Sequence, residues 1–150
     1  MQRTFSSLFI SSLVIWIGAA LFFSLVVLPT LFMNLERANA GTVAALLFPA
    51  YFRLGAAAGG VLLATTLLIA RHAGSSGRTW KLASGVVAAM LTCQLYATFV
   101  VHPEIDSIRG IESSQSRFDT LHKRSVRLNG VILLGGVGLV VCSGWLFDRR

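Results

Sequence analysis

The chain has 150 residues, of which 55% are hydrophobic and only 13% are charged, and its formal net charge is +7. Soluble domains carry about 25% charged residues, so this composition and a mean hydropathy of +0.73 indicate an integral membrane protein. They exclude a soluble enzyme, a secreted disulfide scaffold and a nucleic-acid-binding domain. The 13 Lys and Arg residues are scattered between apolar runs, as expected of charges that flank membrane spans.

The first predicted span covers residues 9–32. The charge-free stretch around it runs from Thr4 to Leu35. The hydrophobic region of a cleavable signal peptide is about 7–15 residues long, so we interpret this longer stretch as a retained span. Pro29 lies near its end, where a proline disturbs a helix least.

The second apolar stretch, residues 42–70, contains Pro49 and Arg53. As a single helix it would be about 43 Å long, which exceeds the hydrocarbon thickness of about 30 Å. We therefore predict a short interfacial helix over residues 42–48 and the second span over residues 52–70.

The second span carries a face of small residues, with Gly55 and Gly59 four positions apart. Helices in lipid associate through close packing, which this spacing favours. Besides the lipid bilayer, the expected partners are therefore a second copy of the chain or a subunit of a membrane complex, contacted through these glycines. No nucleic acid is expected.

The third span is predicted over residues 82–101 and the fourth over residues 126–147. Between them, Pro103 suits the first position of a helix, and from Ser116 a helical pattern runs unbroken to Phe147. The expected fold class is an all-α integral membrane four-helix bundle with short interfacial helices. One such four-span transmembrane domain would occupy residues 1–150.

Four spans place both termini on one side of the membrane. The two sides carry six and seven Lys and Arg residues, and Arg53 and Arg127 fall within predicted helices. The positive-inside rule then favours cytoplasmic termini of a multi-pass protein in a bacterial inner membrane. Cys93 and Cys142 differ in predicted depth by about 12 Å, too far for a disulfide, so we expect two free, buried thiols.

One polar pattern stands above the background. Phe118, His122, Ser125 and Asn129 are spaced i, i+4, i+7 and i+11, which places them on one helical face. His102 ends the third span and Arg53 opens the second at the same membrane boundary. The predicted ligand-binding residues are Arg53, His102, His122, Ser125 and Asn129.

Each of these residues also has a structural interpretation. Arg53 could extend to the lipid headgroups, and His102 could simply end a helix. Ser125 and Asn129 could form hydrogen bonds between spans. Ionisable groups inside spans are costly, however, and face the bundle interior or a water-filled cavity.

The chemistry available to such a site is limited. His102 and His122 are candidate ligands of a transition metal or a haem iron, but no HExxH or CxxC spacing specifies a metal and no cofactor is required. The first hypothesis is a non-enzymatic membrane protein that handles a small ligand or metal ion or assists transport. The alternatives are a haem- or metal-binding redox protein that uses these histidines, and an accessory subunit of a larger membrane complex.

Several short motifs occur in a familiar order. They are Trp16-x-Gly18, Pro29-x-x-Phe32, Ala40-Gly41, Leu47-Phe48-Pro49-x-Tyr51, His102-Pro103 and Phe118-x-x-Leu121-His122-x-x-Ser125-x-x-x-Asn129. In this order the chain resembles the transmembrane protein 205-like domain family, a four-span family with many bacterial members of unknown function. The resemblance implies that His122, Ser125 and Asn129 belong to the family's polar signature, with no catalytic role attached to them.

Overall fold

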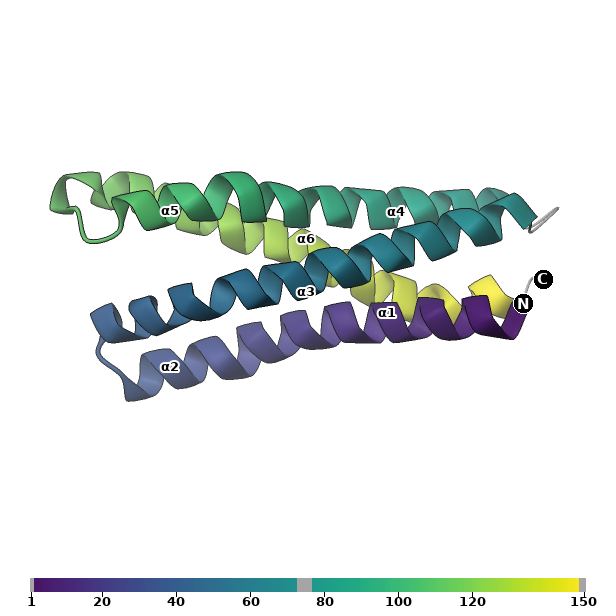
Figure 1. The fold of residues 1–150 in the computed structure, drawn as a ribbon, viewed down its shortest axis with the longest axis horizontal. Helices are drawn as coiled ribbons and strands as arrows, with labels where there is room; N and C mark the ends of the chain where they lie inside the picture. The colour runs from purple at the N-terminus through teal and green to yellow at the C-terminus, as the bar shows by residue number, and fades with distance from the viewer. Residues whose placement is uncertain (1, 73–76, 149–150) are drawn as a thin grey trace.

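The computed structural model describes residues 2–72 and 77–148, which form four long helical rods (Figure 1). Each rod contains a helical stretch long and apolar enough to cross a membrane, so the predicted all-α four-helix bundle is confirmed. The elements in chain order are α1 (Gln2–Phe22), the π-helical turn η1 (Phe23–Val27), α2 (Leu28–Asn34), α3 (Arg37–His72), α4 (Gly77–Tyr96), the π-helical turn η3 (Ala97–Val101), α5 (His102–Ile108), the 3-10 turn η4 (Glu112–Ser114) and α6 (Gln115–Asp148).

The bundle is longer than a membrane is thick. Helices α3 and α6 have 36 and 34 residues, which at 1.5 Å per residue is more than about 50 Å, against a hydrocarbon core of about 30 Å. Helix α1 begins and α6 ends at one end of the bundle (Figure 1), here called the terminal end. The connections from α2 to α3 and from α5 to α6 form the opposite end, here called the loop end.

Helix α3 runs unbroken through Pro49, so the prediction of a separate interfacial helix over residues 42–48 is wrong. The side chain of Pro49 is exposed, and its ring therefore does not displace a neighbouring helix. Elsewhere α3 packs along both α1 and α4. This packing offsets the one backbone hydrogen bond that the proline removes.

The first rod consists of α1, η1 and α2, and the third rod consists of α4, η3 and α5. In each of them a π turn accommodates a proline. The π turn η1 precedes Pro29, and η3 precedes Pro103. The backbone N–H of Leu28 bonds to the carbonyl of Phe23, and the backbone N–H of His102 bonds to that of Ala97, each across five residues. The wider turns relieve the clash between a proline ring and the carbonyl four residues earlier. They also set the direction in which the residues next to them point.

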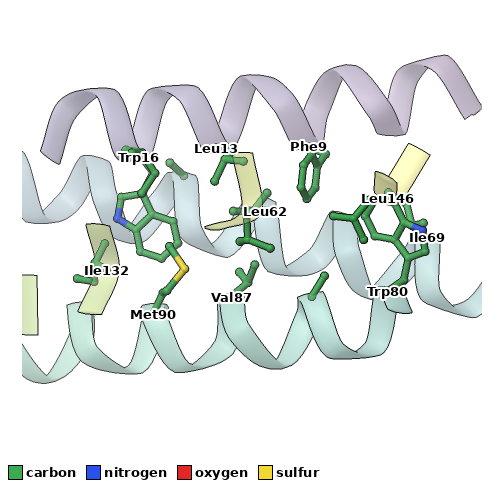
Figure 2. Close-up of a cluster of buried hydrophobic side chains, with 14 of the residues drawn as sticks. Phe9, Leu13, Trp16, Leu62, Ile69, Trp80, Val87, Met90, Ile132 and Leu146 are labelled. Carbon is green, nitrogen blue, oxygen red and sulfur yellow. The ribbon is translucent and has the colours of Figure 1, made fainter. Parts of the chain in front are cut away.

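The main hydrophobic core fills the terminal half of the bundle (Figure 2). Large side chains from all four rods meet there, and most of those shown are less than 5% exposed. Figure 2 shows the ring of Trp16 between the helices, beside Met90 and Ile132. A second, smaller core of Val101, Ile105 and Leu121 joins α5 to α6 near the loop end.

Gly55 and Gly59 are buried inside the bundle rather than on its surface. A methyl group built on Gly59 would lie 2.8 Å from two ring carbons of Trp16, and one built on Gly55 would lie 3.2 Å from Nε1 of the same ring. The glycines thus form a close-packed seam, as expected. The seam receives α1 and α4 of the same chain, which corrects the expectation that these glycines contact a partner.

Both cysteines are free thiols, as predicted. Cys93 is half-buried, but Cys142 is exposed, so the expectation that both are buried is wrong for Cys142. Helix α6 turns Ile132, Leu139 and Leu146 into the bundle. Cys142 lies about 60° around the helix axis from Leu139, at the side of this inward face rather than within it.

Candidate functional site

Five polar side chains from all four rods meet between the two cores. Here they are called the polar junction, and they are Ser24, Tyr51, His102, Ser125 and Asn129. Tyr51 lies 20 residues before Arg71, and His102 lies 21 residues after Lys81, which corresponds to about 30 Å of helix. The hydrocarbon core of a membrane is also about 30 Å thick, so the distance from the charged terminal end to the polar junction matches this thickness.

His102 forms one half of the polar junction. Its Nε2 lies 3.1 Å from the hydroxyl oxygen of Ser125 on α6, and the tautomer of the imidazole decides which group donates. The imidazole centroid lies 4.5 Å from the ring of Phe48 and 4.4 Å from that of Phe52, both on α3. Because His102 is only 8% exposed, this ring is held between α3 and α6 by packing as well as by its hydrogen bond.

Asn129 forms the other half of the polar junction together with Tyr51 and Ser24. The hydroxyl of Tyr51 donates a hydrogen bond of 2.9 Å to Oδ1 of Asn129, and Nδ2 of Asn129 donates one of 3.0 Å to the hydroxyl of Ser24. The ring of Tyr51 stacks on Phe23 at 4.7 Å with an interplanar angle of 13°. One amide on α6 thus joins α3 to the π turn η1 of the first rod.

The two halves are adjacent. Ser125 and Asn129 are one turn apart on α6, and Phe48 contacts both His102 and Phe23. Both π turns lie beside the junction, since Phe23 and Ser24 belong to η1 and His102 directly follows η3. Such turns often occur at functional sites because they aim a side chain differently from a regular helix.

Two further polar groups lie closer to the terminal end, beside Gly55, which is one helical turn from Tyr51 on α3. Nε1 of Trp16 and Nε2 of Gln94 are buried and have no hydrogen-bond partner among the described residues. Both face Gly55, since a methyl group built there would lie 3.2 Å from the former and 2.9 Å from the latter. A buried donor without an acceptor is unfavourable, so these groups mark a place where a polar acceptor would be stabilised.

The structure brings together three of the five predicted site residues: His102, Ser125 and Asn129. Arg53 is exposed, and its Nε donates to the carbonyl of Pro49 within α3. His122 is also exposed and lies parallel to Phe118 on its own helix at 6.2 Å. Among the described residues, neither of these two forms a hydrogen bond with a side chain of the junction.

The rotation of α6 explains the position of His122. Its buried neighbour Leu121 packs against α5 in the smaller core, and this contact turns His122 outward. The spacing of residues 118, 122, 125 and 129 predicted one helical face, and two of these residues, Ser125 and Asn129, lie in the junction. The inward face, however, is centred between Leu121 and Ser125.

Sequence reasoning missed Ser24 as a site residue and named Tyr51 only within a motif. Ser24 is a single hydroxyl in a long charge-free run, which gives little signal. Phe48, Tyr51 and Phe52 are spaced i, i+3 and i+4, and this aromatic face could have indicated that α3 supplies one wall.

The junction offers neutral hydrogen-bonding groups: two hydroxyls, a phenol, an amide and an imidazole. It also pairs an imidazole with a hydroxyl, which the sequence spacing did not predict. Among the side chains that the structure describes, no three of His, Cys, Asp or Glu gather in a way that could hold a metal ion. The arrangement therefore suits recognition of a polar group by hydrogen bonds.

Residues 11–112 match the family described as a domain of unknown function, DUF4149. This match includes Ser24, Tyr51 and His102 but ends before α6. The chain is also similar to an uncharacterized protein of Aquifex aeolicus, with 33% identity over 126 residues that cover 84% of this chain and 86% of the relative. No solved structure matches. The four apolar helices indicate a multi-pass membrane protein. Since residues 11–112 make up more than half of the chain, the chain belongs to the DUF4149 family, whose function is unknown.

Proposed function

We propose that this protein binds a small polar ligand at its polar junction, at one boundary of the membrane, and so handles that ligand or assists its transport. The observation that carries the proposal is the group of five hydrogen-bonded polar side chains to which all four rods contribute. Polar groups between membrane helices are costly unless paired, and pairing between two helices would suffice for packing alone. A junction that includes every rod is typical of a binding site in a helix bundle.

The groups at the junction define the ligand class. None of the five side chains is a carboxylate, a guanidinium or an ammonium group, so hydrogen bonds rather than full charges would select the ligand. The rings of Phe23, Phe48 and Phe52 lie beside these groups and favour a compact, partly apolar molecule. The unpartnered donors of Trp16 and Gln94 favour a ligand that carries a hydrogen-bond acceptor.

Entry to the junction would take place from the loop end. There, Nη1 of Arg109 donates a hydrogen bond of 2.8 Å to the carbonyl of Gly41, and Nη2 forms an ion pair with Asp106. This contact links the end of α5 to the start of α3, beyond the junction. Release of the Arg109 contact would separate these two helices and admit a solute from the aqueous side.

The test is mass spectrometry, without preselection of compounds, of the small molecules that co-purify with the protein in a mild detergent. The Tyr51→Phe and Asn129→Ala variants should lose a compound that the wild type retains. Matched controls are Tyr96→Phe, whose hydroxyl accepts a bond from Arg124, and Asn34→Ala, whose amide bonds to its own helix. The proposal fails if no compound distinguishes the junction variants from these controls.

The redox hypothesis has weaker support. Nε2 of His102 is engaged by Ser125, and His122 is exposed on the outer side of α6. Absorbance of the purified protein near the Soret band, together with metal analysis, tests this hypothesis directly. The hypothesis of an accessory subunit loses its main motivation, because Gly55 and Gly59 pack within the chain.

We also propose a family relationship, a location and an orientation for this protein. The order of the motifs supports kinship with the transmembrane protein 205-like family. The relative in Aquifex aeolicus supports a bacterial inner membrane as the location. Reactivity of single cysteines introduced at either end of the bundle toward a membrane-impermeant thiol reagent would test the cytoplasmic placement of the termini.

A further inference from the structure

A separate feature lies at the terminal end, about 30 Å along α3 from the polar junction. It is a cavity of about 600 Å³ between the end of α3 and the start of α4. Three of its lining residues are cationic and the other three are apolar or small. The lining residues are Leu67, Ala70, Arg71, Gly77, Arg78 and Lys81.

The cationic side chains are not neutralised by the described part of the chain. Arg71, Arg78 and Lys81 are exposed, and neither ion pair of the described residues includes any of them. The acidic residues are concentrated at the other end of the molecule. Five of the six lie in the loop-end half: Glu36, Glu104, Asp106, Glu112 and Asp119. Three cations around one cavity therefore produce a positive potential that an anion would relieve.

The start of α4 adds to this potential. Helix α4 has 20 residues and no acidic residue in its first turn, so the positive end of its dipole is not balanced locally. Gly77 lies against the end of α3, where a methyl group built on it would be 3.1 Å from the carbonyl oxygen of Ala70. This close approach places the start of α4 against the end of α3, so that the two helix ends form adjacent walls of the cavity.

We propose that this cavity binds the phosphate headgroup of an anionic glycerophospholipid. Arg71, Arg78 and Lys81 surround the phosphate, and an acyl chain lies along Leu67 on the outer side of α3. Leu67 is 46% exposed and continues the apolar surface of the span. A lipid matches both the charged and the apolar parts of this lining, whereas free phosphate matches only the charged part.

The test compares lipid adducts by native mass spectrometry of the intact protein in mild detergent. Phosphatidylglycerol should be retained in preference to phosphatidylcholine with the same acyl chains, and millimolar inorganic phosphate should not displace it. The double variant Arg78→Gln/Lys81→Gln should lose affinity for phosphatidylglycerol by about 25-fold, since each basic residue near a membrane surface contributes about fivefold.

The matched control is the double variant Lys123→Gln/Arg127→Gln, which removes two exposed charges from the other end of the bundle. It should retain phosphatidylglycerol like the wild type. The proposal is overturned if both double variants lose the lipid equally, which would indicate general attraction by net charge, or if the Arg78→Gln/Lys81→Gln variant binds like the wild type. Displacement of the lipid by inorganic phosphate would also overturn it. Circular dichroism of each variant checks that the helices are retained.

Discussion

The hydroxyl of Tyr51 on α3 donates a hydrogen bond of 2.9 Å to the side-chain oxygen of Asn129 on α6, across 78 positions of the sequence. The same amide reaches Ser24 in the first rod through its nitrogen. Asn129 therefore uses its acceptor and one of its donors for two different helices. A residue with this arrangement fixes the relative rotation of three rods.

Loss of the Tyr51 hydroxyl should destabilise the bundle. In Tyr51→Phe the ring still stacks on Phe23, but the oxygen of Asn129 loses its donor, at a cost of about 1 kcal/mol. Unfolding in mixed micelles with increasing sodium dodecyl sulfate measures the change. The Tyr96→Phe control removes an exposed hydroxyl and should change the free energy of unfolding by less than about 0.5 kcal/mol. Equal effects would contradict the role assigned to Tyr51.

The two histidines near the loop end should differ clearly. His102→Ala removes a buried ring that packs against Phe48 and Phe52 and leaves Ser125 without its partner, so we expect a loss of about 2–4 kcal/mol. His122→Ala alters an exposed side chain and should cost less than about 0.5 kcal/mol. The same unfolding assay compares them. A larger effect at His122 would show that α6 is rotated differently from the structure described above.

Gln94→Met should stabilise the ligand-free protein. The change removes the buried Nε2 that has no partner among the described residues and keeps a side chain of similar length. We expect a gain of about 1 kcal/mol, because an unpaired buried donor is replaced by an apolar group. Gln115→Met, on an exposed position of α6, is the control and should be neutral. Destabilisation by Gln94→Met would mean that Nε2 is hydrogen-bonded to a molecule that remains with the purified protein.

Two neighbouring glycines of α3 should respond in opposite ways to alanine. Gly59→Ala places a methyl group 2.8 Å from the ring of Trp16, and the overpacking should cost about 1–3 kcal/mol. Gly60→Ala meets no atom within 4 Å and should be neutral or stabilising by up to about 1 kcal/mol, since alanine favours a helix. Thermal unfolding in detergent measures both. A similar response of the two variants would contradict the close contact between Trp16 and α3.

The two cysteines should differ in reactivity. Cys142 is exposed, whereas Cys93 is half-buried among the helices. An apolar maleimide in detergent should therefore label Cys142 faster than Cys93, and mass spectrometry of peptides measures the two rates. The single variants Cys93→Ser and Cys142→Ser assign the signals. Faster labelling of Cys93 would be inconsistent with the packing of α4.

The amino-acid sequence alone determined the class of protein, the number of rods and the level at which the polar residues lie. Backbone groups have no water to bond with in a hydrocarbon core, so long apolar stretches must form helices whatever their neighbours are. The charge-free run from Thr4 to Leu35 and the pattern from Ser116 to Phe147 are therefore readable without a fold. Depth follows in the same way, because helix length is proportional to the number of residues.

The tertiary structure alone decided which side of each helix faces inward and what each residue contacts. The rotation of a helix about its axis depends on packing between the rods. As a result of this packing, His122 is exposed, Ser125 contacts His102, and the ring of Trp16 packs closely against Gly59. Packing also explains why α3 continues past Pro49 as one helix, because contacts along the whole helix outweigh one missing hydrogen bond. Such contacts join residues distant in the sequence, and no local pattern of the chain contains them.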